Sequence, residues 1–173
     1  MNPHTQPWAA ARSGLLALLL LALAATWLAP QPALASERKA KVVYHADFAD
    51  PRRFSSMLTS VNFMVTHYTN EMIDFDVRIV FLSHGIRFLT NDPLTGTPFA
   101  EDAALVQQRE NLRGRLLALN QVHGVKLELC EITRAQVNLD PSRLFPGVER
   151  VPSGVVRIAQ LQNEYGFAYI KIE

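Results

Sequence analysis

Short apolar runs alternate with longer stretches of helical periodicity along most of the chain, and this alternation restricts the fold more than any other feature. The runs have the length of buried strands and are rich in β-branched residues. Between them, apolar residues recur three or four positions apart, as in amphipathic helices. The alternation predicts right-handed βαβ units, and therefore an α/β fold with a parallel sheet and helices on both faces. The expected strands are 42–46, 77–82, 125–130, 148–151 and 167–172.

Capping residues and turn formers set the expected ends of the longer helices. Asp50 and Pro51 supply an N-cap and a proline at the first helical position, and predict a helix from Pro51 to about Asn70. Residues 90–100 are dense in turn formers and predict a loop. A leucine face then continues to about Asn120 and predicts a second long helix.

The third expected strand, 125–130, alternates apolar and polar residues and ends at Cys130. One of its faces is therefore expected to be only partly covered, or to meet another subunit. Thr133 and Gln136 have the spacing of a capping box and predict that a short helix opens at Thr133. Ser153 is expected to cap a further helix.

The first 35 residues differ in character from the rest of the chain. An apolar run from Gly14 to Leu28 is shorter than the roughly 20 residues that a bilayer core requires. The triplet 33–35 has alanine at its first and third places, as signal peptidase requires, and predicts cleavage before Ser36. We expect residues 1–35 to be a signal peptide and 36–173 to be a single periplasmic domain. An uncleaved membrane anchor is the alternative.

Charge restricts the classes of partner. The leader contains one basic residue, Arg12, and no acidic one, so the remainder of the chain is formally neutral and has no basic clusters. This composition argues against a nucleic-acid partner. No later segment is long and apolar enough to span a membrane, so we expect no membrane association after cleavage.

Cys130 is the single cysteine. An exported chain with one cysteine cannot be a disulfide scaffold, so its stability must come from its core. The thiol then fills space as a small hydrophobe, forms an intermolecular bridge, or is reactive.

Two imidazoles and the thiol follow the ends of three expected strands. His45 lies at the end of the first strand, His84 after the second, and Cys130 at the end of the third. Binding sites in open α/β sheets lie beyond the carboxyl ends of the strands. If these strands are neighbours, the three side chains share one rim and form the candidate catalytic set.

Several familiar sites are missing from the sequence. It contains no G-x-G-x-x-G, no P-loop, no C-x-x-C and no G-x-S-x-G motif, so we expect neither a nucleotide cofactor nor a dithiol. The candidate metal ligands are scattered singly, and we expect no metal.

The surroundings of Cys130 bear on its reactivity. It precedes the expected N-cap Thr133 by three residues, and the free N–H groups of a helix N-terminus stabilise a thiolate. Arg134 would add to this effect, whereas Glu131 would oppose it.

Short blocks in both halves of the chain resemble the DsrE/DsrF-like family, in an exported form. The C-terminal blocks are the most specific and occur in order: 130–134 (CEITR), 144–148 (LFPGV), 151–155 (VPSGV), 158–162 (IAQLQ) and 165–170 (YGFAYI). The N-terminal half agrees through 41–45 (KVVYH), Asn62 and 80–85 (VFLSHG).

The resemblance implies a three-layer sandwich with a five-stranded parallel sheet, assembled as a homo-oligomer, either a trimer or a hexamer. It also implies that a cysteine at the place of Cys130 carries a persulfide and passes its outer sulfur from a donor to an acceptor protein. The favoured function is thus a periplasmic sulfur carrier or sulfurtransferase. Two alternatives remain open: a non-catalytic small-ligand-binding protein that uses His45, His84 and the 90–100 loop, and a thiol redox sensor.

Overall fold

The computed structural model describes residues 39–173, so the predicted signal peptide and its cleavage site lie outside the described residues. Five strands form one parallel sheet in the order β4-β3-β2-β1-β5. They are β1 (Ala40–Ala46), β2 (Phe75–Phe81), β3 (Lys126–Cys130), β4 (Val148–Val151) and β5 (Ala168–Ile170). The predicted α/β class, the five strands and the parallel sheet are therefore confirmed.

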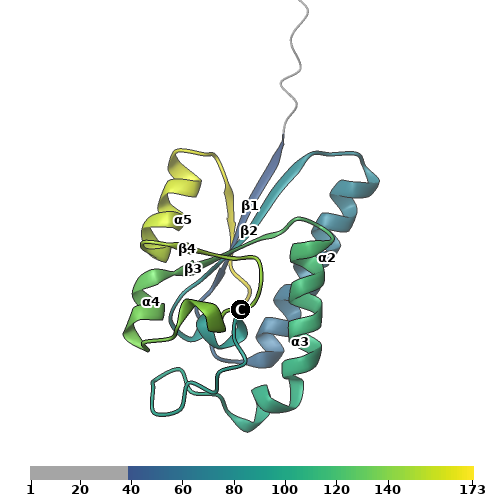
Figure 1. Ribbon diagram of the computed structural model, residues 1–173. Helices are drawn as coiled ribbons and strands as arrows, with labels where there is room; N and C mark the ends of the chain where they lie inside the picture. The colour runs from purple at the N-terminus through teal and green to yellow at the C-terminus, as the bar shows by residue number, and fades with distance from the viewer. Residues whose placement is uncertain (1–38) are drawn as a thin grey trace, which may run out of the picture. The chain divides into compact units, whose positions relative to one another are not determined.

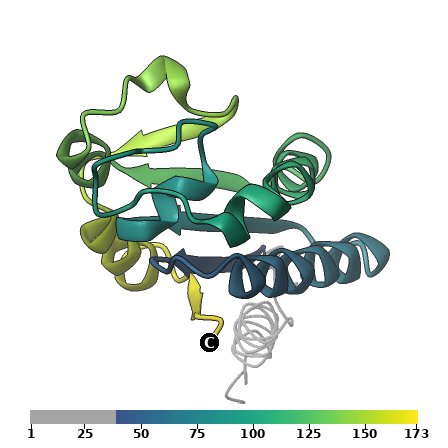
Figure 2. The same cartoon turned by 90° about the horizontal axis from the view of Figure 1, so that it is seen from below.

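Helices cover both faces of the sheet. α2 (Pro51–Asn70) and α3 (Ala103–Gln121) lie on one side, and α4 (Glu131–Gln136) and α5 (Gly154–Asn163) lie on the other (Figure 1). Seen from below, the strands separate these two layers (Figure 2). Two 3-10 turns, η1 (Ser83–Phe88) and η2 (Pro141–Arg143), complete the elements. No helix among residues 39–173 combines the length and apolarity needed to cross a bilayer.

The larger hydrophobic core fills the space between the sheet and the α2–α3 layer. Tyr44, Phe81 and Leu129 contribute to it from three adjacent strands, and Phe54 stacks on Phe88 with ring centroids 4.0 Å apart. The α5 side has a smaller core of five residues. Its members are Val43, Val80, Ile158, Leu161 and Phe167.

Two predicted helix starts are confirmed by their caps. The Asp50 side chain accepts a hydrogen bond from the Arg52 amide at 2.8 Å, and α2 begins at Pro51. The Ser153 hydroxyl accepts one from the Val156 amide at 3.4 Å, at the start of α5.

The predicted helix start at Thr133 is wrong. α4 begins at Glu131, directly after β3, and Cys130 itself occupies the N-cap position. Thr133 is therefore the third residue of the helix rather than its N-cap, and its hydroxyl accepts a hydrogen bond from the Ser83 amide at 3.0 Å. This long-range bond ties η1 to α4.

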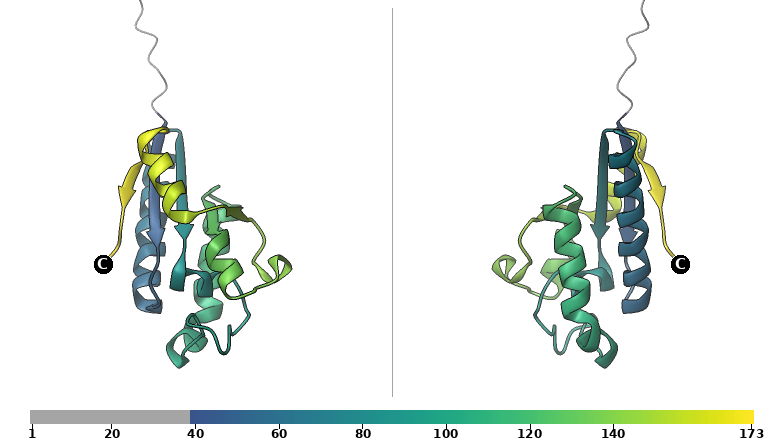
Figure 3. Two further views of the ribbon diagram at one scale, coloured as in Figure 1. Left: turned by 90° about the vertical axis from the view of Figure 1, so that its left-hand side faces the viewer. Right: turned by 90° about the vertical axis from the view of Figure 1, so that its right-hand side faces the viewer.

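β5 is shorter than the predicted strand and pairs with β1 only along Val42–Tyr44. It forms one edge of the sheet, and the chain ends just beyond it (Figure 3). The other edge is β4, which matches the strand predicted for residues 148–151.

Candidate functional site

Cys130 lies where β3 ends and two helices begin. It is the last residue of β3 and the N-cap of α4, pairs with Val151 of β4, and is 5% exposed. Its side chain is on the α5 side of the sheet, since it alternates with the core residue Leu129 on the opposite face.

Gly154, the first residue of α5, lies against Cys130. A Cβ atom added at Gly154 would lie 3.1 Å from Cys130 Cβ and 3.1 Å from Leu82 Cδ2. Such contacts are closer than most side chains adopt, so the absence of a side chain brings the first turn of α5 against the thiol.

Burial and hydrogen bonding act in opposite directions on the thiol. Burial raises the pKa of Cys130, but the backbone amides of Gly154, Thr133 and Ile132, together with the Thr133 hydroxyl, lower it, and the net pKa is below the ordinary value. The Thr133 oxygen accepts its bond from Ser83, which leaves its own proton to donate to sulfur. Four donors from two helix starts therefore favour the thiolate.

The expected influence of Arg134 and Glu131 on the thiol is not found. The Arg134 guanidinium donates to Glu131 Oε1 at 2.9 and 2.7 Å, and Arg150 also approaches Glu131, at 3.5 Å. Arg134 and Glu131 are therefore paired with each other, and the lowered pKa of Cys130 comes from neutral donors instead.

The hydrogen bond made by its neighbour Ser83 places His84 at the carboxyl edge of the sheet. β1, β2 and β3 are adjacent in the sheet, as the shared rim requires. Ser83 bonds to Thr133, and the half-buried His84 ring then packs edge-on against Phe99 at a centroid distance of 5.1 Å. Its buried Nδ1 atom has no hydrogen-bond partner within residues 39–173.

His45 lies farther from the thiol. His45 pairs in register with Val80 of β2, which pairs with Glu128 of β3. It therefore lies two strands away from β3, at a position two residues before Cys130. The backbones of His45 and Cys130 are more than about 9 Å apart. Its Nδ1 atom is 2.9 Å from the Tyr169 hydroxyl, and its Nε2 atom is 3.7 Å from Asp47 Oδ2. Burial lowers the pKa of His45 despite the opposing charge of Asp47. Neither His45 nor His84 hydrogen-bonds to Cys130.

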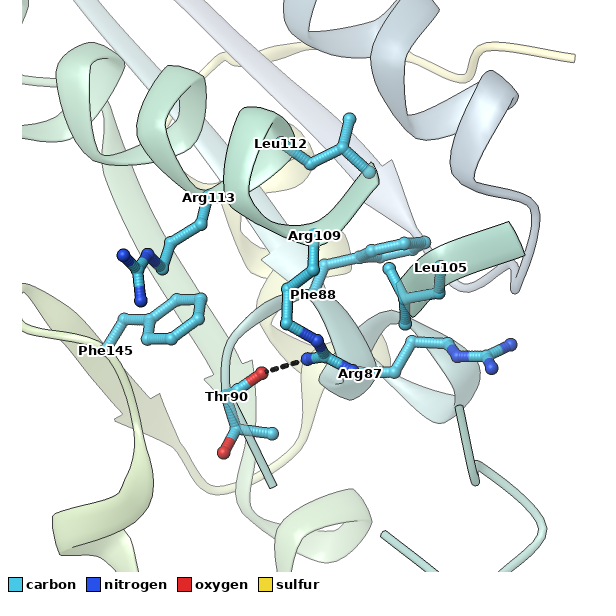
Figure 4. Close-up of a pocket in the computed structure, with 8 residues that line it drawn as sticks. All are labelled: Arg87, Phe88, Thr90, Leu105, Arg109, Leu112, Arg113 and Phe145. Carbon is cyan, nitrogen blue, oxygen red and sulfur yellow. Dashed lines mark hydrogen bonds between the residues drawn. The ribbon is translucent and has the colours of Figure 1, made fainter. Parts of the chain in front are cut away.

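The 90–100 loop is tied to its surroundings rather than open. Arg109 Nη1 donates to the Thr90 carbonyl at 2.7 Å (Figure 4). Leu94 and Phe99 are buried. The hollow beside Thr90 has a volume of about 10 Å³, which is close to the minimum for one water molecule. A hollow of this volume is too small for an organic ligand.

The half-polar face of β3 holds an ion cluster that the sequence did not reveal. Glu128, 1% exposed, accepts bonds from Arg78 at 2.7 Å and from Arg157 at 2.7 and 2.9 Å. Arg78 also holds Asp76 through bonds of 2.9 and 2.6 Å. The α5 helix covers this face, so the expectation that it would be only partly covered is wrong at Glu128. Among residues 39–173, no group of three or more His, Cys, Asp or Glu side chains is placed to hold a metal ion.

Comparison with known proteins agrees with this architecture. The family model of the DsrE/DsrF-like family matches residues 41–172. The chain belongs to the DsrE/DsrF-like family. Members of this family generally act in sulfur relay. The sequence matches no curated protein.

Two solved structures share the fold. Protein MTH1491 of Methanobacterium thermoautotrophicum, described as a protein of unknown function, is 25% identical with a TM-score of 0.58. The YchN protein of E. coli is 19% identical with a TM-score of 0.50, a likeness of fold alone. Each comparison covers 77% of this chain and 99% of the other protein.

Sequence reasoning missed Gly154 and Thr133 as residues of the thiol site. The segment Ser153–Gly154 offered one signal, since glycine directly after an N-cap brings a helix start close to whatever lies beside it. Nothing in the sequence indicated that the Ser83 amide would donate a hydrogen bond to the Thr133 hydroxyl.

Proposed function

We propose that this protein carries sulfur as a persulfide on Cys130. The thiolate attacks the outer sulfur of a donor such as thiosulfate, the S–S bond of the donor breaks, and sulfite leaves with that bond's electron pair. An acceptor thiolate then attacks the outer sulfur of the persulfide and regenerates the Cys130 thiolate. Both steps conserve charge and require no oxidant.

The observation that supports this proposal is the set of hydrogen-bond donors around the buried thiol of Cys130. A cysteine that merely fills apolar space has a raised pKa, because burial disfavours its charged form. At Cys130 the amides of Gly154, Thr133 and Ile132 and the Thr133 hydroxyl outweigh burial. The same donors would stabilise the negative charge that develops on the inner sulfur as the outer sulfur passes to an acceptor.

Sulfur loading tests the proposal directly. Wild-type protein incubated with thiosulfate or polysulfide should gain the mass of one sulfur atom in intact-protein mass spectrometry, and a reductant should remove it. Cys130→Ala should gain nothing while its circular dichroism and thermal unfolding stay unchanged. If wild-type protein gains no sulfur from any donor, or if Cys130 resists alkylation until the protein unfolds, the thiol is structural filling.

His84 and His45 provide a matched pair of variants. His84 follows Ser83, which contacts the helix after Cys130, whereas His45 lies two strands away. His84→Ala should slow transfer from loaded protein to a small acceptor thiol without reducing loading, and His45→Ala should have the smaller effect on transfer. Equal transfer in both variants and in wild type would remove the histidines from the reaction.

We further propose that this relay operates in the periplasm, in a trimer or a hexamer. Three exposed apolar residues near the thiol, Ile132, Val155 and Val156, are 62%, 65% and 54% exposed, which favours a partner or a second copy at this surface. N-terminal sequencing of exported protein should begin at Ser36. Light scattering on the 36–173 protein should give three or six copies, and a persistent monomer at micromolar concentration would rule this assembly out.

A further inference from the structure

A hollow of about 240 Å³ lies beneath α5, near the amino ends of the strands. Its walls include Lys41 and Asp76, the second residues of β1 and β2, with Arg78, Arg157, Tyr165 and Phe167. Cys130 lies at the opposite end of β3, more than about 12 Å from the first residue of that strand. The hollow is therefore separate from the thiol site.

Positive charge exceeds negative charge around this hollow. Three cationic side chains line it: Lys41, Arg78 and Arg157. A fourth, Lys126, forms an ion pair with Asp76 in its wall. The carboxylates that these cations contact are Asp76 and Glu128. Despite burial, which raises it, the pKa of each carboxyl is held below its ordinary value by the bonded arginines, so both are ionised at neutral pH. The four cations and two carboxylates leave an excess of two positive charges.

Two cationic groups retain donors that face no carboxylate. Lys41 Nζ donates to the Tyr165 carbonyl at 2.9 Å, and no ion pair joins it to any residue within 39–173. Arg157 uses Nε and Nη2 on Glu128, and its Nη1 makes no hydrogen bond within the described part of the chain. Both side chains line the hollow. The intramolecular pairs thus account for the buried carboxylates but not for the surplus cationic donors.

We propose that this hollow binds a small dianionic oxyanion, held by Lys41 and Arg157. A doubly charged oxyanion compensates the excess charge and accepts several charge-assisted hydrogen bonds at once. A volume of about 240 Å³ accommodates such an ion together with water, since one water molecule takes about 30 Å³. This binding requires no part of the Cys130 chemistry.

Calorimetry with the 36–173 protein tests the proposal. Sulfate and inorganic phosphate should each bind saturably with one ion per chain, at an ionic strength held constant with sodium chloride. Lys41→Met should weaken this binding by about tenfold or more, because it removes one charge-assisted contact. Lys171→Met is the matched control, since Lys171 follows β5 and contacts Asp47 and Glu173 instead. It should bind as wild type does, and so should Cys130→Ala.

Nitrogen NMR of the arginine side chains gives a second measurement on wild-type protein, independent of any variant. Sulfate should shift the Arg157 Nε–H resonance and leave that of Arg52, an exposed arginine on α2, in place. The proposal is overturned if sulfate binds no better than chloride, or if Lys41→Met binds sulfate as wild type does. In either case the ion cluster serves only to hold α5 on the sheet.

Discussion

The two faces of the sheet are built on different principles. Towards α2 and α3, the strands present apolar residues almost exclusively, and these form the larger core. Towards α5, β3 presents Lys126, Glu128 and Cys130, which alternate along the strand with residues of the larger core. The apolar cluster on this side has only five buried residues. One face therefore supplies most of the hydrophobic stabilisation, while the other contains Cys130 and the ion cluster around Glu128.

This difference shows how a small domain buries charge without losing its fold. Glu128 is as inaccessible as the core leucines, but it is acceptable there because Arg78 and Arg157 satisfy both of its oxygens. A buried pair of this kind adds little net stability, although removing one partner is costly. The cluster instead fixes where α5 lies, and α5 in turn brings Gly154 against Cys130.

A matched leucine-to-alanine pair tests the comparison with the largest expected effect. Leu116→Ala removes a buried side chain from the larger core and should lower the free energy of unfolding by about 3–5 kcal/mol. Leu161→Ala should cost only about 2 kcal/mol, because Leu161 borders the hollow beneath α5 and water can enter the space. Urea unfolding measures both. Equal losses would mean that the two faces contribute alike.

Glu128→Gln tests the charged face. It leaves two arginines without their shared carboxylate and should cost about 3 kcal/mol at pH 7. The pKa of Glu128 is lower in the folded state than in the unfolded chain, so its contribution is present above about pH 4.3 and is lost as the pH falls further. The difference between variant and wild type in urea unfolding should therefore shrink in acid. Glu110→Gln, on an exposed pair of α3, should change stability by less than about 1 kcal/mol.

Gly154→Ala sharpens the link between α5 and the thiol. Its added Cβ would lie 3.1 Å from Cys130 Cβ, so the helix start must retreat by a few tenths of an ångström and weaken the amide contact with sulfur. The pKa of Cys130 should rise, and alkylation at pH 7 should slow severalfold, since less of the thiol is ionised. The pH at half-maximal alkylation rate measures this shift. An unchanged value would show that the donors on α4 suffice.

Gly114→Ala has the smallest expected effect and serves as the control for Gly154→Ala, since Gly114 lies on the other face of the sheet. Gly114 lies within α3, is exposed, and has open space around its missing side chain. Alanine should stabilise the protein by about 0.5–1 kcal/mol by favouring the helix. Thermal unfolding should show the gain, while the alkylation profile of Cys130 stays that of wild type. A change in thiol reactivity would mean that the two faces are coupled.

Features that depend on neighbouring residues were predictable from the sequence. Asp50 and Pro51 define the start of α2 through contacts within one turn, and the apolar periodicity that follows predicts the buried face of that helix. The alternation of strands and helices likewise predicted the parallel sheet. Local hydrogen bonding and burial of one face determine these features, and both are visible in a short window of sequence.

The thiol site depended on contacts between distant segments. Thr133 has the spacing of a capping box, but Ser83, fifty residues earlier, occupies its hydroxyl, and Cys130 becomes the N-cap.

By itself, the sequence determined an α/β domain with a parallel sheet, its principal helices, and a single thiol at the end of a strand. Only the tertiary structure decided what surrounds that thiol and what neutralises Glu128. The physical reason is range: helix caps and periodicity depend on residues within about four positions, whereas the partners of a buried side chain depend on which elements pack together. Arg157, which is 29 residues away from Glu128, meets it only once α5 lies on the sheet.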